Sequence, residues 1–177
     1  GLQIIDVVDP AANGAASIAT APSLTGTLAT ADISLGLTLS PDGNTAYVAD
    51  RTSGLLIINT SDPANPSLRA TLDTSGASFG VALSGDGNTA FVADHSSGLQ
   101  IINVSNPASP SLSATLDTSG TARAVTLSAD GNTAFVADGD DGLDIINVSD
   151  PTNPTLTGTY NTSGTAYGVA LSADGNT

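Results

Sequence analysis

A sequence unit of 44 residues recurs along this chain and limits what it can fold into. The clearest copy spans residues 98–141, and nearly the same text begins again at Gly54 and at Gly142. Repeats of roughly 20 to 50 residues are typical of architectures in which each unit buries its apolar surface against the next. We therefore expect one repeat domain over residues 1–177, with repeats starting near 1, 54, 98 and 142, as part of a longer chain or assembly.

Each repeat contains four short apolar segments that predict β-strands. In the clearest copy they span 98–102, 111–118, 124–128 and 133–138, here named the first to fourth segments. They are rich in Leu, Ile, Val, Thr or Phe and are bounded by Gly, Pro, Asn, Asp or Ser, which is the pattern of strands separated by turns. No segment has apolar residues at helical spacing over about ten positions. The chain is predicted to be all-β.

The acidic residues are predicted to shape turns. All 17 are aspartate, and the chain has neither Glu nor Lys. Aspartate favours turns and caps, and the Asp-Gly pair between the third and fourth segments suits the positive φ angles of a tight hairpin. This Asp-Gly-Asn-Thr tetrapeptide starts at Asp42, Asp86, Asp130 and Asp174. A ring of metal ligands is the weaker interpretation of the same four residues.

The first segment predicts how the sheets pack. Its neighbouring apolar residues, such as Ile101 and Ile102, point to opposite faces of a sheet, so both faces should be buried. A sheet stacked between two similar sheets explains this pattern. One aromatic residue per repeat stands at one position of the fourth segment and should pack between sheets: Tyr47, Phe91 and Phe135.

Four antiparallel strands in about 44 residues match one blade of a β-propeller. The predicted fold is an all-β propeller of four such four-stranded blades. One blade lacks a strand within this chain, because the fourth segment occurs three times and the others four times. Three explanations stay open. The chain is a piece of a longer propeller, two copies complete a ring, or a neighbour donates a strand and builds a filament.

Composition excludes several partners. The net charge is -14, and the only permanent cations are Arg51, Arg69 and Arg123. Such a chain repels nucleic acid and anionic membrane surfaces. Cysteine is absent, which excludes disulfides and thiolate chemistry, and no run of 18 apolar residues predicts a membrane-spanning helix. The first repeat carries extra residues around 11–26, which we expect to form a surface loop.

Two features of the sequence bear on metal or acid–base chemistry. Asp138, Asp140 and Asp141 place three carboxylates in four residues, and hard oxygen ligands of this kind bind Ca²⁺. A solvated acidic loop is the favoured alternative, because the equivalent loops lack the cluster. His95 has no second His and no Cys to work with, so it is predicted to be an exposed loop residue. No cofactor other than this candidate calcium ion is expected.

Four asparagines lie in Asn-x-Ser/Thr sequences and are candidates for glycosylation in a secreted protein. They are Asn59, Asn103, Asn147 and Asn161. The alternative is that the first three cap a turn, because they occupy one position of the repeat, at the end of the first segment.

The text GLxIINVSDPxxP followed by AxVxLSxDGNTAFVAD resembles the LVIVD-repeat proteins. It is also similar to the YVTN-type propellers of surface-layer proteins. The resemblance covers essentially the whole chain and implies a β-propeller, an extracellular or cell-surface location and no catalytic residues. One departure is the asparagine at 59, 103 and 147, where the family pattern has aspartate; Asp6 keeps it.

The sequence therefore predicts a non-catalytic structural or interaction module that self-associates, as a filament or envelope component. Its expected partners are copies of itself or flanking blades, with glycan as a modification. The alternative is a propeller that binds carbohydrate or another small ligand, with or without Ca²⁺. The absence of Trp and the few aromatic residues argue against it. A lactonase-type enzyme would need a cluster of His, Glu and Asp, and this chain has one His and no Glu.

Overall fold

A computed structural model describes residues 1–6 and 23–172, and all of its regular elements are β-strands. The fourteen strands form four antiparallel sheets, which confirms the all-β prediction. The fourth Asp-Gly-Asn-Thr copy at Asp174 and most of the insertion at 11–26 lie outside the described residues. In the described part of the chain, no helix could cross a bilayer.

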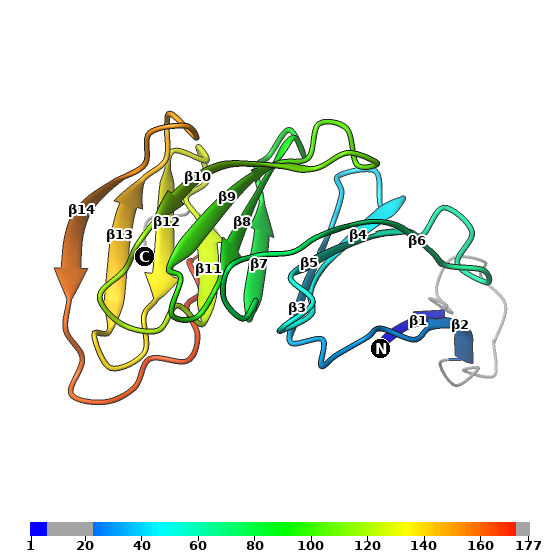
Figure 1. The fold of residues 1–177 in the computed structure, drawn as a ribbon, viewed down its shortest axis with the longest axis horizontal. Helices are drawn as coiled ribbons and strands as arrows, with labels where there is room; N and C mark the ends of the chain where they lie inside the picture. The colour runs from blue at the N-terminus through cyan, green and yellow to red at the C-terminus, as the bar shows by residue number, and fades with distance from the viewer. Residues whose placement is uncertain (7–22, 173–177) are drawn as a thin grey trace, which may run out of the picture.

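Three of the sheets have four strands each, hydrogen-bonded in chain order. The first contains β3 (Gly36–Leu39), β4 (Thr45–Ala49), β5 (Leu55–Asn59) and β6 (Ser67–Leu72). The second contains β7 (Gly80–Leu83), β8 (Thr89–Ala93), β9 (Leu99–Asn103) and β10 (Ser111–Leu116). The third contains β11 (Ala124–Leu127), β12 (Thr133–Ala137), β13 (Leu143–Asn147) and β14 (Thr155–Tyr160). The sheets stand side by side in chain order (Figure 1).

The remaining sheet has only two strands, β1 (Leu2–Asp6) and β2 (Ser23–Leu28). Each four-stranded sheet begins with a third segment and ends with a second segment, so it joins strands from two consecutive copies of the repeat. Among the described residues, the strand shortfall is larger than the single strand predicted. The β1–β2 sheet holds only first and second segments, and the last third segment, at 168–171, forms no strand.

The two-stranded sheet keeps the geometry of the complete ones. Its register shifts between Ile4 and Ile5, and the β5–β6 register shifts at the equivalent place, between Ile57 and Ile58. β1 is thus the counterpart of β5. The difference is that β5 pairs with β4 on one side and β6 on the other, whereas within residues 1–6 and 23–172 β1 pairs with β2 alone.

The core lies between the sheets, as the first segment predicted. Tyr47 joins Val92 and Ile102 in one apolar cluster, and Phe91 joins Val136 in the next. Every residue from Leu55 to Ile58 is buried, so both faces of β5 are covered. In the third sheet Phe135 is only half-buried, because that sheet has a neighbour on one face only.

Candidate functional site

The predicted hairpin turns are present at all three tetrapeptides that the structure describes. In each, the aspartate accepts hydrogen bonds from a serine hydroxyl two residues earlier and from an asparagine amide two residues later. For Asp42 these are Ser40 Oγ at 2.5 Å and Asn44 N at 3.0 Å. Gly43 has φ +71°, which glycine adopts without strain. Asp86 and Asp130 repeat this arrangement, so these aspartates act as turn residues.

The prediction that acids only shape bends is wrong for a second set of aspartates. Asp50, Asp94 and Asp138 end the three fourth segments and have no exposed surface. Asp94 accepts hydrogen bonds from Thr74 Oγ1 at 2.6 Å, from the Gly76 amide at 2.8 Å and from Ser78 Oγ at 3.0 Å. These donors belong to the linker between the first and second sheets. We name the three buried residues the aspartate clamp.

The clamp ties consecutive sheets together at one end. Asp138 repeats two of the three contacts of Asp94, accepting from Thr118 Oγ1 at 2.6 Å and from the Gly120 amide at 2.7 Å. The linker between the first and second sheets is also held by the first sheet, because Arg51 and Ser78 exchange two backbone hydrogen bonds. The signal for this role was present in the sequence. An aspartate ends every fourth segment, and a Thr and a Gly or Asp stand 20 and 18 residues before it.

The calcium candidates do not form one exposed loop. Asp138 is buried in the clamp, Asp141 is half-buried, and the exposed Asp140 accepts a short hydrogen bond from Thr165. The expectation of a solvated loop is therefore wrong for Asp138. No group of three or more His, Cys, Asp or Glu side chains within 1–6 and 23–172 is arranged to hold a metal ion. Calcium binding here stays a prediction.

His95 is not the exposed loop residue that the sequence predicted. It is half-buried, and its ring stacks on Phe79 with centroids 5.2 Å apart and planes at 29°. Its φ of 51° lies in the left-handed region, where Arg51 also falls and where the third repeat has Gly139.

The glycosylation candidates cap turns. Asn59 and Asn103 each accept two hydrogen bonds through Oδ1, from the amide and the hydroxyl of the serine two residues later. Asn147 accepts one from the Ser149 amide. Asn103, Asn147 and Asn161 are exposed, whereas Asn59 is half-buried. The capping interpretation is thus confirmed for the first three, and glycan attachment stays a prediction.

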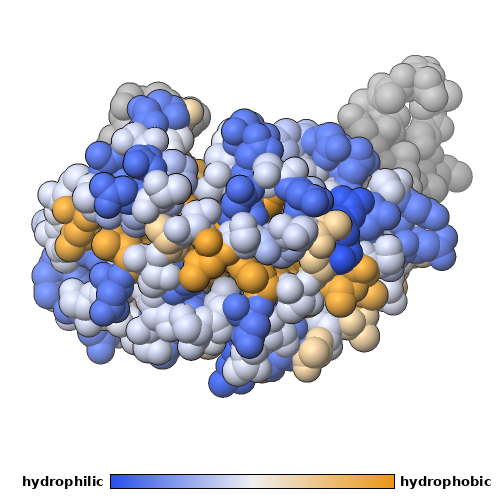
Figure 2. All heavy atoms as spheres, turned by 45° about the horizontal axis from the view of Figure 1, so that its top comes forward, coloured by the Kyte–Doolittle hydropathy of each residue, from blue (hydrophilic) through white to orange (hydrophobic). Residues whose placement is uncertain are grey.

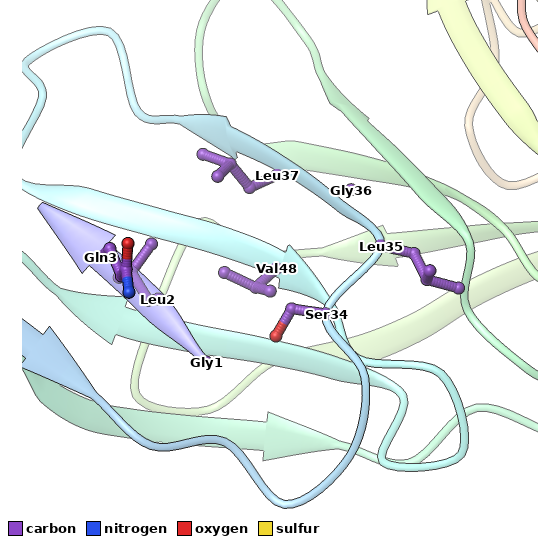
Figure 3. A pocket seen from close by; sticks show the side chains of 8 residues that line it. All are labelled: Gly1, Leu2, Gln3, Ser34, Leu35, Gly36, Leu37 and Val48. Atoms are coloured by element: carbon purple, nitrogen blue, oxygen red, sulfur yellow. The ribbon is translucent and has the colours of Figure 1, made fainter.

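An apolar groove lies between the two-stranded sheet and the first complete one. Figure 3 shows Leu2 and Gln3 of β1 facing Leu37 and Val48 across a pocket of about 160 Å³. A second pocket of about 280 Å³ shares Leu2 and Leu37 and adds Leu39. We name this pair of pockets the β1–β3 groove. Figure 2 shows further apolar side chains gathered in a band across one face of the molecule.

Comparison with solved structures gives the same fold. A functionally unknown protein from Desulfotomaculum acetoxidans DSM 771 matches with a TM-score of 0.73 at 20% identity, over 87% of this chain and 50% of that one. A candidate 6-phosphogluconolactonase from Bacteroides uniformis ATCC 8492 matches with 0.70 at 16%, over 80% and 45%. A third match, a candidate 6-phosphogluconolactonase from Bacteroides fragilis NCTC 9343, gives 0.65 at 17%, over 73% and 39%.

The chain therefore spans half or less of the length of these solved proteins. No curated protein matches it. The profile of the LVIVD repeat matches three consecutive stretches, residues 38–74, 75–118 and 119–162, which together cover well over half of the chain. These stretches follow the three complete sheets almost strand for strand. The chain belongs to the LVIVD repeat family.

Proposed function

We propose that this chain is a non-catalytic β-propeller module that acts as a scaffold and associates by accepting a β-hairpin of its own repeat type. The hairpin adds to the open edge of β1 and fills the β1–β3 groove. One observation carries the proposal. The β1–β2 sheet covers only part of the first complete sheet and leaves Leu37 and Leu39 of β3 exposed, whereas their counterparts in the second and third sheets are covered.

The open edge of β1 supports strand addition. Its counterpart β5 pairs with a fourth-segment strand over its whole length, from Thr45 opposite Asn59 to Ala49 opposite Leu55. β1 pairs with β2 in the register in which β5 pairs with β6, but it has no such neighbour among the described residues. An unpaired strand edge presents a row of free backbone donors and acceptors, which is a template for another strand.

The exposed leucines of β3 support the same conclusion. Leu37 and Leu39 are 55% and 51% exposed. Their counterparts Val81 and Leu83 are partly buried, and they pack against the cluster that contains Tyr47. Burying a leucine side chain stabilises a complex by about 1.5–3 kcal/mol, so these two side chains favour a partner that brings an aromatic residue to the position of Tyr47.

The occupant that fits is a hairpin with the pattern of β11–β12. Its fourth-segment strand would pair with β1, and its phenylalanine would cover Leu37 as Tyr47 covers the second sheet. A flanking blade of the same protein and a neighbouring molecule offer the same chemistry. The three matched structures are longer than this chain, which agrees with further blades beside it.

We further propose an extracellular or cell-surface location. The resemblance to surface-layer propellers supports it, as do the exposed sequons at Asn103 and Asn147. Mass spectrometry of the protein purified from its native source would test this, since an unmodified intracellular protein would contradict it.

Titration with a labelled peptide of residues 122–138 tests the hairpin site directly. We expect saturable binding to the chain, measured by fluorescence anisotropy, and at least tenfold weaker binding of the Phe135→Ser peptide. The chain variant Leu37→Ser/Leu39→Ser should also lose binding. A matched control is Leu112→Ser, which changes a leucine of the outer strand β10 that is equally exposed, at 54%. Binding that ignores Phe135 or the two leucines would overturn the proposal.

Light scattering of the unlabelled chain separates the two sources of the hairpin. Concentration-dependent self-association that the peptide suppresses assigns the groove to a neighbouring molecule. A monomer that still binds the peptide assigns it to a flanking blade. Failure of both peptide binding and self-association would remove the proposed function.

A further inference from the structure

We propose that the rim of the inner strands carries a binding site for a carboxylated sugar, centred on Arg123 between the rings of Phe79 and Tyr167. The inference is independent of the β1–β3 groove. It rests on a row of side chains that recurs every 44 residues. Leu35, Phe79, Arg123 and Tyr167 each stand one residue before Gly36, Gly80, Ala124 and Gly168.

The repeat brings this row together. The inner strands β3, β7 and β11 contact one another in order. The residues just before them therefore line up along one rim of the sheets. Arg123 Cζ lies over both neighbouring rings, 5.7 Å from the centroid of Phe79 and 4.8 Å from that of Tyr167. His95 extends the row by stacking on Phe79.

The backbone beside Arg123 is fixed. His95 and Ala122 exchange two hydrogen bonds of 3.0 Å, which hold His95 at its left-handed φ of 51°. A residue other than glycine pays a conformational penalty there, and such penalties concentrate at functional sites. The equivalent residue of the third repeat is Gly139, so the fold does not require a histidine at this place.

The charge of Arg123 is left for a ligand. Its Nε is buried and has no hydrogen-bond partner among the described residues. Because Nε is buried, the terminal N–H groups of the guanidinium are the route of approach for a ligand. A planar fork of this kind pairs bidentately with a carboxylate. In a chain with net charge -14, this cation is a local exception.

Tyr167 supplies the second half of the site. It is 70% exposed, which is unusual for a large ring beside a cation. An exposed aromatic ring combines an apolar face with a polar tip, which suits the C–H face and hydroxyl edge of a sugar. The scarcity of aromatic residues had argued against carbohydrate binding, but the fold exposes one ring where a guanidinium can anchor an acid. A uronic acid unit satisfies both contacts.

Calorimetric titration with trigalacturonic acid tests the site. We expect saturable binding by the chain and at least tenfold weaker binding by Arg123→Gln and by Tyr167→Ala. The matched control is Arg69→Gln, because Arg69 is an exposed arginine whose side chain bonds Thr45, away from the row. Thermal melting of each variant confirms that it folds. Tyr167 lies outside the sheets, so its variant provides a second reading if Arg123→Gln fails to fold.

Two further ligands distinguish recognition of the carboxylate from recognition of the sugar ring. Neutral galactotriose lacks the carboxylates and should bind at least tenfold more weakly. Sodium acetate at equal carboxylate concentration should not compete, because it lacks the sugar face. Equal binding of neutral and acidic sugars, equal loss in the Arg69 and Arg123 variants, or no binding at all would overturn the inference. Retention of trigalacturonic acid binding in Leu37→Ser/Leu39→Ser would show that this site is separate from the groove.

Discussion

The fourth-segment strands have an aspartate at each end, and the two aspartates are held in opposite surroundings. Asp86 precedes β8 and is exposed at the tip of a hairpin, whereas Asp94 follows the same strand and has no exposed surface. Both accept a hydroxyl bond and a backbone N–H bond. The same side chain and the same donors thus serve two purposes. At the tip they reverse the chain, and in the interior they hold the linker that joins two sheets.

The difference in burial between the two aspartates determines how much their hydrogen bonds contribute to the stability of the fold. A hydrogen bond that forms in water replaces one to water, so its net contribution is small. A buried carboxylate cannot replace a lost protein hydrogen bond by one to water. Removing the carboxylate also leaves its buried donors without an acceptor. The clamp should therefore matter more for stability than the turns, although both recur with the repeat.

Replacing Asp94 by Ala should give the largest loss of stability. The change leaves the hydroxyls of Thr74 and Ser78 and the amide of Gly76 without their acceptor in a buried place. We expect the free energy of unfolding to fall by about 3 kcal/mol or more, measured by urea denaturation. Asp86→Ala is the matched control and should cost clearly less. Equal losses in the two variants would show that burial does not distinguish them.

Replacing two glycines by Ala should have an intermediate effect on stability. The two variants distinguish a steric clash from backbone strain. A Cβ on Gly120 would lie 2.1 Å from the Asp138 carbonyl oxygen and 2.7 Å from its Oδ2, so the clamp must open. A Cβ on Gly131 would meet nothing within 4 Å, but that residue has φ +72°. We expect Gly120→Ala to cost about 2–3 kcal/mol and Gly131→Ala about 1 kcal/mol.

Thermal melting with urea titration of both glycine variants measures the order of the two effects. A larger loss for Gly131→Ala would mean that the clamp yields to the added methyl group. It would also mean that conformational strain at the tips governs stability more than the buried contacts do.

The same contrast explains what could be predicted from the sequence. The turn bonds join residues two positions apart, such as Asp42 and Asn44, so local chemistry alone predicts them. The repeat and the paired apolar residues of the first segment likewise predicted the strands and their packing. The clamp bonds span 16 to 20 positions, from Ser78 or Thr74 to Asp94. The contact of Arg123 with Phe79 spans a whole repeat. Such contacts depend on how sheets stand beside each other, which strand patterns do not specify.

The clamp is not uniform along the repeats. Burial raises the pKa of Asp50, but hydrogen bonds from Ser34 and Thr30 outweigh it and leave the pKa lowered. Burial also raises the pKa of Asp138, and there the bonds from Thr118 and Gly120 do not outweigh it. The reason is visible in the sequence, because Ala122 stands where Ser34 and Ser78 donate a hydroxyl in the earlier repeats. Nearby Asp144 and Asp141 add repulsion.

Acid titration should show the smallest effect and distinguish the turn aspartates from Asp138 by sign. A hydrogen bond from Ser40 is the largest cause that lowers the pKa of Asp42, from 3.8 to about 2, and serine bonds lower the pKa of Asp86 and Asp130 in the same way. The contribution of Asp42 to stability is complete above about pH 4 and is lost as the pH falls through about 2, and the contributions of Asp86 and Asp130 are lost in the same direction. Asp138 acts in the opposite direction, because its raised pKa means that the folded protein gains stability when this residue takes up a proton.

Replacing the three turn aspartates by Asn should therefore flatten the fall in melting temperature below about pH 4. Asp138→Asn should act above about pH 4 instead, because it removes the stability that the parent protein gains there as Asp138 takes up a proton. Melting curves at half-unit pH intervals measure both slopes. Two variants with slopes parallel to the parent protein would show that neither set governs the acid response. A flattened fall below about pH 4 in both would mean that Asp138 resembles the turn residues and that burial does not set its sign.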